Sequence, residues 1–92
     1  MESYSVRFTE EGKRKLHELH IETQKKIKNS LKELSKDISF GKKLIGRLAG
    51  FSSLTVGKYR AIYTIEREII MIHYVGHRED VYNNFEKSLG WK

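Results

Sequence analysis

The sequence predicts a small α+β domain, in which a helical hairpin packs on a mainly antiparallel, curved sheet between a first short strand and a final short helix. Two observations support this prediction. Leucines and isoleucines recur every three or four residues in the first half of the chain, as they do in amphipathic helices. β-branched and aromatic residues dominate residues 53–75, as they do in strands. Because 92 residues leave room for one core, we expect a single domain over residues 1–92.

The chain is predicted to open with a strand and a helix. Tyr4, Val6 and Phe8 alternate with polar residues, which is typical of a half-buried strand. Thr9 can cap the helix that follows, because its hydroxyl can accept a hydrogen bond from a free backbone amide. Gly12 would then let this helix approach the sheet closely.

A second helix is predicted to begin at Ile21 or Glu22. Its apolar residues lie four, three and four positions apart and form one stripe that must pack on the sheet: Ile27, Leu31, Leu34 and Ile38. The opposite face is rich in lysine, which we interpret as a solvated surface. His17 and His20 lack the acidic neighbours and spacing of a metal site, so we assign them no function.

Residues 39–50 contain three glycines and are predicted to form a mobile loop. This loop carries three cations, Lys42, Lys43 and Arg47. They either contact phosphates, as flexible basic loops do without reading base sequence, or belong to an ordinary solvated connection. The sequence leaves both interpretations open.

Residues 53–65 are predicted to form a β-hairpin. Gly57 and Lys58 make a two-residue connection with glycine first, which is typical of a type II′ turn. Alternation along the second strand separates two faces, one with Tyr59, Ala61, Tyr63 and Ile65 and the other with Arg60, Ile62 and Thr64. A guanidinium is costly to bury unpaired, so we expect Arg60 to lie on an open sheet face or to bind a ligand.

The apolar run Ile69–Val75 is expected to be the central, most buried strand, with His73 as a core or edge residue. Asp80 follows in a polar cluster and can cap a final short helix. That helix would carry Val81, Tyr82 and Phe85. Trp91, near the end of the chain, either packs back on the domain or stays exposed.

The composition of the chain favours some classes of function and excludes others. The net charge of +6 and the pI near 9.6 fit contact with nucleic acid or the ribosome. The chain has no cysteine, which excludes disulfides and cysteine-based chemistry, and we expect neither a metal nor a cofactor. No apolar run approaches the ~20 residues of a membrane span, and the first residues lack a signal-peptide profile. These features favour the cytoplasm and no membrane partner.

Three blocks of the sequence resemble the RelE/ParE toxin superfamily. They are Lys43-Leu44-Ile45-Gly46, the hairpin from Ser53 to Tyr63, and Val75-Gly76-His77-Arg78-Glu79-Asp80-Val81-Tyr82. The first strand and the helical hairpin fit the same pattern, so the resemblance covers nearly the whole chain and implies a small RelE-like fold. The superfamily consists of cytoplasmic toxins of toxin–antitoxin modules. RelE-type members cleave mRNA in the ribosomal A site, and ParE-type members poison DNA gyrase.

The resemblance also implies a site on a concave, basic sheet face. The arginine of the Tyr-Arg strand motif falls on Arg60, the arginine of the Val-Gly-x-Arg block on Arg78, and the tyrosine after it on Tyr82. Two basic residues that usually precede the turn are replaced by Ser53 and Thr55, at positions assigned to proton transfer and charge stabilisation. The candidate RNA-contacting residues are Lys42, Lys43, Arg47, Ser53, Thr55 and Lys58.

RNA cleavage without a metal requires a deprotonated 2′-hydroxyl, a stabilised phosphorane and a protonated 5′-oxygen. Arg60 and Arg78 suit the phosphorane, because each guanidinium can donate paired hydrogen bonds to phosphate oxygens. An imidazole can take up and release a proton near neutral pH, so His77 is the candidate for acid–base catalysis. Tyr82 either orients the 2′-hydroxyl, stacks on a base or packs on the core. Lys58 either replaces a missing lysine or only decorates the turn.

Structural roles compete with these assignments. Arg60 could instead form a bridge to Glu66, Glu68 or Glu79. Arg78 and Asp80 could instead have a purely structural role in the last turn.

The sequence therefore predicts a toxin that inhibits translation as a ribosome-dependent mRNA endoribonuclease. The alternatives are a ParE-like gyrase inhibitor without catalytic activity and a degenerate member that only binds its antitoxin; Ser53 and Thr55 favour these alternatives. The resemblance implies a RelB-like antitoxin and a toxin–antitoxin heterotetramer. A segment of that antitoxin, disordered when free, would dock on the helical hairpin and cover the basic face.

Overall fold

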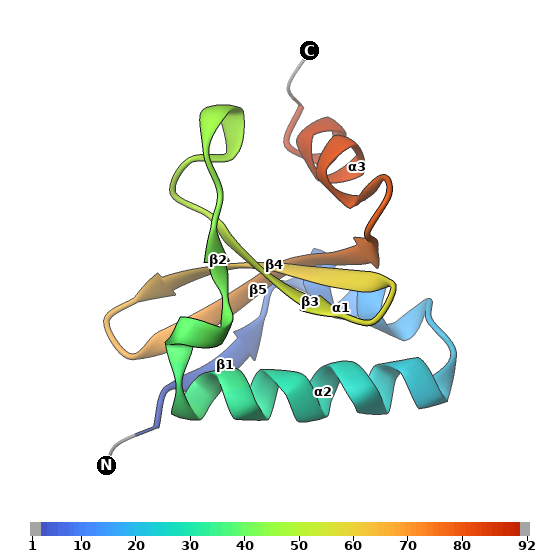
Figure 1. The fold of residues 1–92 in the computed structure, drawn as a ribbon. Coiled ribbons are helices and arrows are strands. Elements are labelled where there is room, and N and C mark those ends of the chain that lie inside the picture. The colour runs from blue at the N-terminus through green and yellow to red at the C-terminus, as the bar shows by residue number, and fades with distance from the viewer. Residues whose placement is uncertain (1–2, 91–92) are drawn as a thin grey trace.

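The computed structural model describes residues 3–90, so Trp91 lies outside the described residues. The elements, in chain order, are β1 (Ser5–Phe8), α1 (Glu10–His17), α2 (Ile21–Lys36), the 3-10 helix η1 (Ile38–Phe40), β2 (Lys42–Lys43), the 3-10 helix η2 (Gly46–Leu48), β3 (Ser52–Val56), β4 (Tyr59–Glu66), β5 (Ile69–His77) and α3 (Val81–Ser88). The strands form one sheet in the order β1-β5-β4-β3-β2. The helix α2 lies along one face of this sheet, while α3 rises from the other (Figure 1).

The α+β prediction is confirmed, and the sheet is mainly antiparallel. Among the strands of residues 3–90, β1 runs parallel to its neighbour, β5, and the other neighbours pair in antiparallel fashion: β5 with β4, β4 with β3 and β3 with β2. The middle strand is β4, so the expectation that the Ile69–Val75 run would be the central strand is wrong. The strand β5 is nevertheless internal, because β1 pairs along its outer edge.

The segment predicted to be a mobile loop contains a short edge strand. Lys42 pairs with Ser53 and Lys43 with Ser52, so the backbone of these two lysines is held by β3. This corrects the loop prediction for the two residues. The glycine and lysine content of a segment indicates only its local backbone preference. Whether the segment forms a strand also depends on a neighbouring strand with which it can pair.

The hairpin between β3 and β4 matches the prediction. Gly57 has a φ of +60°, whereas Lys58 is not among the residues with positive φ, as a type II′ turn requires. Val56 pairs with Tyr59 across this turn. The register then places Arg60 between Thr55 on β3 and Gly76 on β5.

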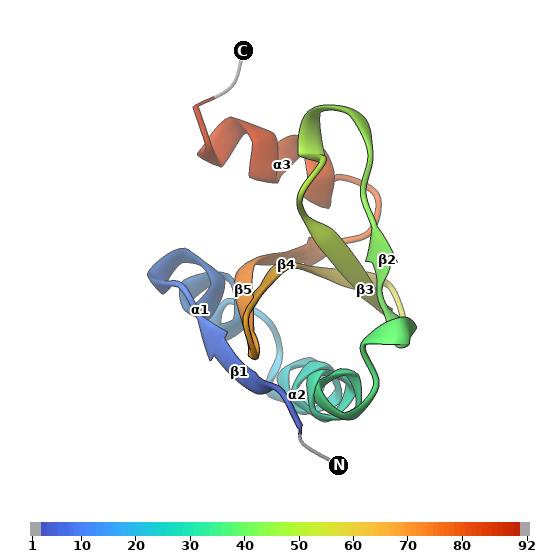
Figure 2. The ribbon, with the colours of Figure 1, turned by 90° about the vertical axis from the view of Figure 1, so that its left-hand side faces the viewer.

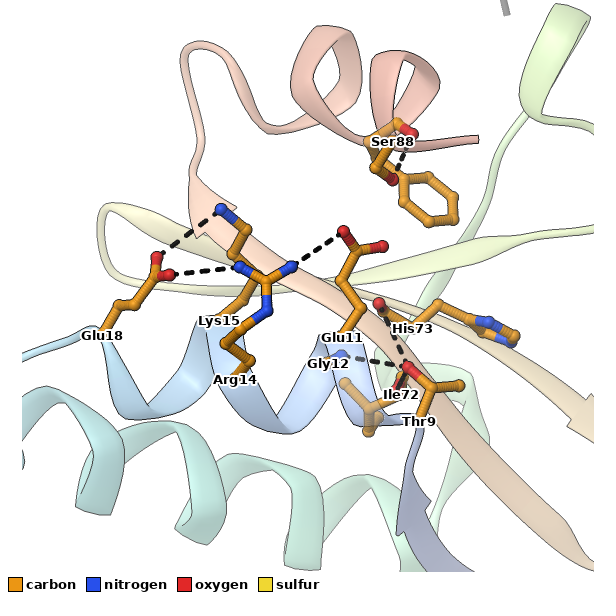
Figure 3. A network of polar contacts seen from close by, with 10 residues as sticks. Thr9, Glu11, Gly12, Arg14, Lys15, Glu18, Ile72, His73 and Ser88 are labelled. Carbon is orange, nitrogen blue, oxygen red and sulfur yellow. Dashed lines mark hydrogen bonds and ion pairs between the residues drawn. The ribbon is translucent and has the colours of Figure 1, made fainter. Parts of the chain in front are cut away.

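The helix α1 is fixed to β5 by its first turn. The Gly12 amide donates to Thr9 Oγ1 at 3.0 Å, and the Thr9 hydroxyl donates to the Ile72 carbonyl at 3.3 Å (Figure 3). A Cβ atom on Gly12 would lie only 2.3 Å from that carbonyl oxygen. The predicted cap and the predicted close approach are both confirmed.

The outer surface of α1 carries a chain of ion pairs. Arg14 lies 3.3 Å from Glu11 and 3.4 Å from Glu18, and Lys15 lies 3.5 Å from Glu18 (Figure 3). These pairs follow the spacing of three or four residues that brings side chains together on a helix. They are largely exposed, so each is expected to contribute little to stability.

The predicted stripe of the second helix is confirmed except at its end. Ile27, Leu31 and Leu34 are buried, but Ile38 is 39% exposed. The helix ends at Lys36, and the carboxylate of Asp37 accepts a hydrogen bond from the Ser39 amide at 3.0 Å to begin η1. The turn of direction at Asp37 carries Ile38 away from the sheet.

The two faces of the sheet carry separate apolar clusters. The larger cluster lies between α1, α2 and the sheet and contains Leu16, Ile27, Leu31, Leu34, Leu54, Ala61, Tyr63, Ile70, Ile72 and Val75. The smaller cluster lies under α3 and contains Leu48, Ile62, Tyr74, Val81 and Phe85. The face that bears Arg60 is therefore partly covered by α3.

The pairing of β4 with β5 shifts by one residue between Ile62 and Tyr63. Ile62 pairs with Tyr74 and Tyr63 with Ile72, so His73 is an extra residue opposite β4. Its Nε2 lies 2.9 Å from Thr64 Oγ1, and its ring packs edge-on against Phe51. His73 is thus a half-buried packing residue at a bulge.

None of the helices within residues 3–90 combines the length and apolar character that crossing a membrane requires.

Candidate functional site

A groove lies on the α3 side of the sheet, between two walls. One wall is the β2–β3 arm, by which we mean residues 44–51, and the other is α3; both rise from the same side of the sheet (Figures 1 and 2). The groove has a volume of about 420 Å³ and is lined by Lys42, Lys43, Leu44, Ile45, Arg47, Leu48, Arg60, Tyr82 and Glu86. Four of these nine residues are lysine or arginine and one is acidic, so the lining of the groove carries a net positive charge.

Arg60 lies in this groove with its charge unmatched. Its Nε is buried without a hydrogen-bond partner, and its guanidinium carbon lies 5.2 Å from the centre of the Tyr82 ring. Among the ion pairs of residues 3–90, none joins Arg60 to Glu66, Glu68 or Glu79, which were the structural alternatives for it. A buried donor without a partner is costly to the free protein, and an anionic ligand would satisfy it.

Tyr82 spans the groove from α3 to β3. Its hydroxyl shares a hydrogen bond of 3.0 Å with the hydroxyl of Ser53, which is only 4% exposed. This hydrogen bond joins Tyr82 of α3 to a buried residue of β3. Thr55, by contrast, is exposed beside Arg60.

The basic residues of the arm and of β2 surround this centre. Lys42 and Lys43 are exposed, and the pairing with β3 fixes their backbone. Arg47 Nη1 lies 3.7 Å from Glu86 Oε1 on α3, so the pair joins the two walls. Glu86 is the charged residue of the groove that the sequence did not identify. Its position four residues after Tyr82 on the same helix was the signal that could have identified it.

The structure does not bring His77 to this groove. His77 pairs with Tyr59 across the strands, and their rings meet edge to face at 5.7 Å. Tyr59 packs against the larger cluster, on the face opposite Arg60. Strand alternation is the reason, because neighbouring residues of β4 point to opposite faces. The imidazole Nδ1 of His77 accepts a hydrogen bond from the Glu79 amide at 3.3 Å.

Arg78 and Lys58 lie together beyond the groove lining. The Arg78 amide donates to the Lys58 carbonyl at 2.7 Å, which ties the last turn to the hairpin turn. Both side chains are exposed. The helix α3 begins after Asp80 as predicted, but the Asp80 side chain makes no capping hydrogen bond. Within residues 3–90 no group of histidine and acidic side chains is arranged to hold a metal ion.

Comparison with known proteins places this chain in a family. Residues 6–82 match the family described as "ParE toxin of type II toxin-antitoxin system, parDE". The chain is 36% identical over 83 residues to toxin RelG of Mycobacterium tuberculosis, an alignment that covers 86% of this chain and 95% of RelG.

Solved structures agree with that match. The toxin–antitoxin complex RelBE2 from Mycobacterium tuberculosis contains a chain with a TM-score of 0.78 and 34% identity, covering 87% of this chain and 97% of that one. A mutant of Escherichia coli toxin RelE in the free state has a TM-score of 0.75 at 20% identity, covering 96% and 99% of the two chains, and supports the fold alone. The chain therefore belongs to the RelE/ParE family of toxins from type II toxin–antitoxin systems.

Proposed function

We propose that this toxin inhibits translation by cleaving mRNA in the ribosomal A site, without a metal or a cofactor. The observation that supports this function best is the buried, unpartnered Nε of Arg60 in a groove whose other cations are Lys42, Lys43 and Arg47. Such a groove can hold the backbone of a single strand through its phosphates.

In the proposed reaction the 2′-oxygen attacks the adjacent phosphorus and the bond to the 5′-oxygen breaks. The products carry a 2′,3′-cyclic phosphate and a 5′-hydroxyl. Arg60 would stabilise the charge that develops on the phosphorane oxygens, because its Nε is buried without a partner and its guanidinium lies against the Tyr82 ring. The exposed Arg78 would reach the RNA from the turn, and Tyr82 would stack on a base or hold the 2′-hydroxyl.

The proposed setting is cytoplasmic, with a RelB-like antitoxin as the partner that restrains the toxin. RelBE2, the relative at 34% identity, was solved as a toxin–antitoxin complex. For this chain we propose that the antitoxin packs on the helical hairpin, covers the basic groove and forms a heterotetramer with the toxin.

Primer extension on an mRNA translated by purified ribosomes tests the nuclease. We expect cuts within A-site codons for the wild type and a loss of about 100- to 1,000-fold in cleavage rate for Arg60→Met, because one transition-state donor is removed. Arg78→Ala should also abolish the cuts while the fold survives. Arg7→Ala is the matched control, since Arg7 is an exposed arginine on β1, outside the groove. Wild-type protein that is folded but makes no cuts would refute the proposal.

A second candidate is a gyrase inhibitor without chemistry of its own. His77 points to the opposite face, so none of the groove residues that the structure describes is a histidine, and the Tyr82 hydroxyl is already bonded to Ser53. Gyrase-dependent DNA breaks with intact mRNA in cells that express the toxin would establish this candidate. Folded protein that produces neither effect would leave a member that only binds its antitoxin.

A further inference from the structure

We propose that Glu86 is the catalytic residue that accepts the proton of the 2′-hydroxyl during RNA cleavage. This inference rests on the endoribonuclease proposed above and assigns a role that neither the sequence motifs nor the family match supplies. It starts from a gap in the site, because the reaction needs a proton acceptor and His77 faces away from the groove.

Glu86 has the right position. It lies four residues after Tyr82 on α3, so the two side chains project from the same side of the helix, one turn apart. Both line the groove that contains Arg60, and the Tyr82 ring contacts the Arg60 guanidinium. The Glu86 side chain is only 24% exposed, so it lies within the groove wall rather than extending into bulk water.

The chemistry of the neighbouring groups leaves Glu86 as the acceptor. The charged groups that line the groove with Glu86 are Lys42 and Lys43 of β2, Arg47 of η2 and Arg60 of β4, with the phenol of Tyr82 on its own helix. Lysine, arginine and tyrosine side chains ordinarily hold their protons at neutral pH, whereas a carboxyl group is ordinarily ionised there. Among the groove residues that the structure describes, Glu86 is the one carboxylate.

The ion pair with Arg47 is compatible with this role. The two groups are 3.7 Å apart, and the Arg47 side chain is 57% exposed, so solvent and other anions can reach the pair. A phosphate that enters the groove can compete for Arg47, because a phosphate also accepts paired hydrogen bonds from a guanidinium. Arg47 would then be turned toward the RNA, and the Glu86 carboxylate would become free to accept a proton.

The proposed step moves one proton and exchanges one bond at phosphorus. The 2′-hydroxyl proton passes to a Glu86 carboxylate oxygen while the 2′-oxygen forms a bond to phosphorus. The bond from phosphorus to the 5′-oxygen breaks, and the 5′-oxygen takes a proton from water. Glu86 then releases its proton to solvent, so the residue is unchanged at the end of the reaction.

The test is the pH dependence of single-turnover cleavage on ribosomes with a defined A-site codon. For Glu86→Gln we expect a loss of about 100- to 10,000-fold in rate, which is the range for a general base. The decline of the wild-type rate toward acidic pH should also disappear in this variant. Glu86→Asp should recover part of the rate and the acidic decline. Glu33→Gln, which changes an exposed carboxylate on α2, is the matched control and should cleave like the wild type.

The variant Arg47→Met distinguishes two roles of Glu86: accepting the proton, or only positioning Arg47. If Glu86 is the base, Arg47→Met loses less rate than Glu86→Gln and keeps the acidic decline. Equal losses in the two variants, or an unchanged pH profile in Glu86→Gln, would overturn the assignment while leaving the nuclease in place. A wild type that does not cleave would overturn both proposals together.

Discussion

The two faces of the sheet differ in the residues that they bury. The face under α1 and α2 is closed and apolar, and its side chains interlock across β4 and β5. The face under α3 has a smaller apolar cluster and leaves beside it a groove with a buried, unpartnered arginine nitrogen. Burial of apolar surface stabilises the first face, whereas the second keeps a buried hydrogen-bond donor without a partner, which is unfavourable. The fold is thus held mainly from one side, and the other side is available for chemistry.

Truncation on the closed face should have the largest effect on stability. Leu34 is fully buried between α2 and the sheet, so Leu34→Ala should lower the free energy of unfolding by about 2–5 kcal/mol. Urea denaturation followed by circular dichroism measures this change. Ile45→Ala is the control, because Ile45 is 88% exposed and the substitution should stay within about 0.5 kcal/mol. Similar losses for both would mean that α2 is not the main support of the sheet.

A smaller effect on stability is expected from removing the hydrogen bond that joins Tyr82 of α3 to Ser53 of β3. Tyr82→Phe should cost about 1–3 kcal/mol, since it leaves the buried Ser53 hydroxyl without its partner. Adding Ser53→Ala should recover part of this loss, because the unpaired group is then removed as well. Unfolding free energies of the wild type, both single variants and the double variant give the coupling energy. Strictly additive effects would show that the hydrogen bond does not hold Tyr82 in place.

The smallest expected effect is a pH dependence that originates at the bulge of β5. Burial lowers the pKa of His73, so the folded protein favours the neutral imidazole and the unfolded chain binds more protons. The stability contributed by this group is complete above the ordinary histidine value of ~6.5 and is lost as the pH falls below it. His73→Gln should therefore lose stability less steeply on acidification than the wild type.

Thermal denaturation of both proteins at neutral and mildly acidic pH measures that difference. The other ionisable groups are common to the two proteins, so their contributions cancel in the comparison. Identical pH slopes would mean that the packing of His73 against Thr64 and Phe51 does not disfavour its charged form.

Most of the fold followed from local sequence patterns. Spacing of three and four residues identified α2 and its buried residues, alternation separated Ala61 and Tyr63 from Arg60, and glycine in the first turn position identified the hairpin. These features depend on neighbours within a few positions of the chain, so the sequence contains all that is needed to predict them. The same reasoning failed at Ile38, where capping by Asp37 ended the helix before the stripe ended.

Half of the candidate site followed from the sequence as well. Arg60 and Tyr82, to which the family motifs pointed, line one groove together with Lys42, Lys43 and Arg47, whose role the sequence left open. His77 does not join them, because a single residue of strand register decides which face it occupies.

What the sequence determined by itself is therefore the set of amphipathic elements, the basic charge and the family motifs. Only the tertiary structure decided that Lys42 and Lys43 form an edge strand, that α3 covers part of the Arg60 face and that Glu86 meets Arg47 across the groove. The physical reason is range. Periodicity and turn preference act between residues close in the chain, whereas strand register and the approach of α3 to the β2–β3 arm depend on packing between more distant residues, such as Lys42 with Ser53 and Arg47 with Glu86.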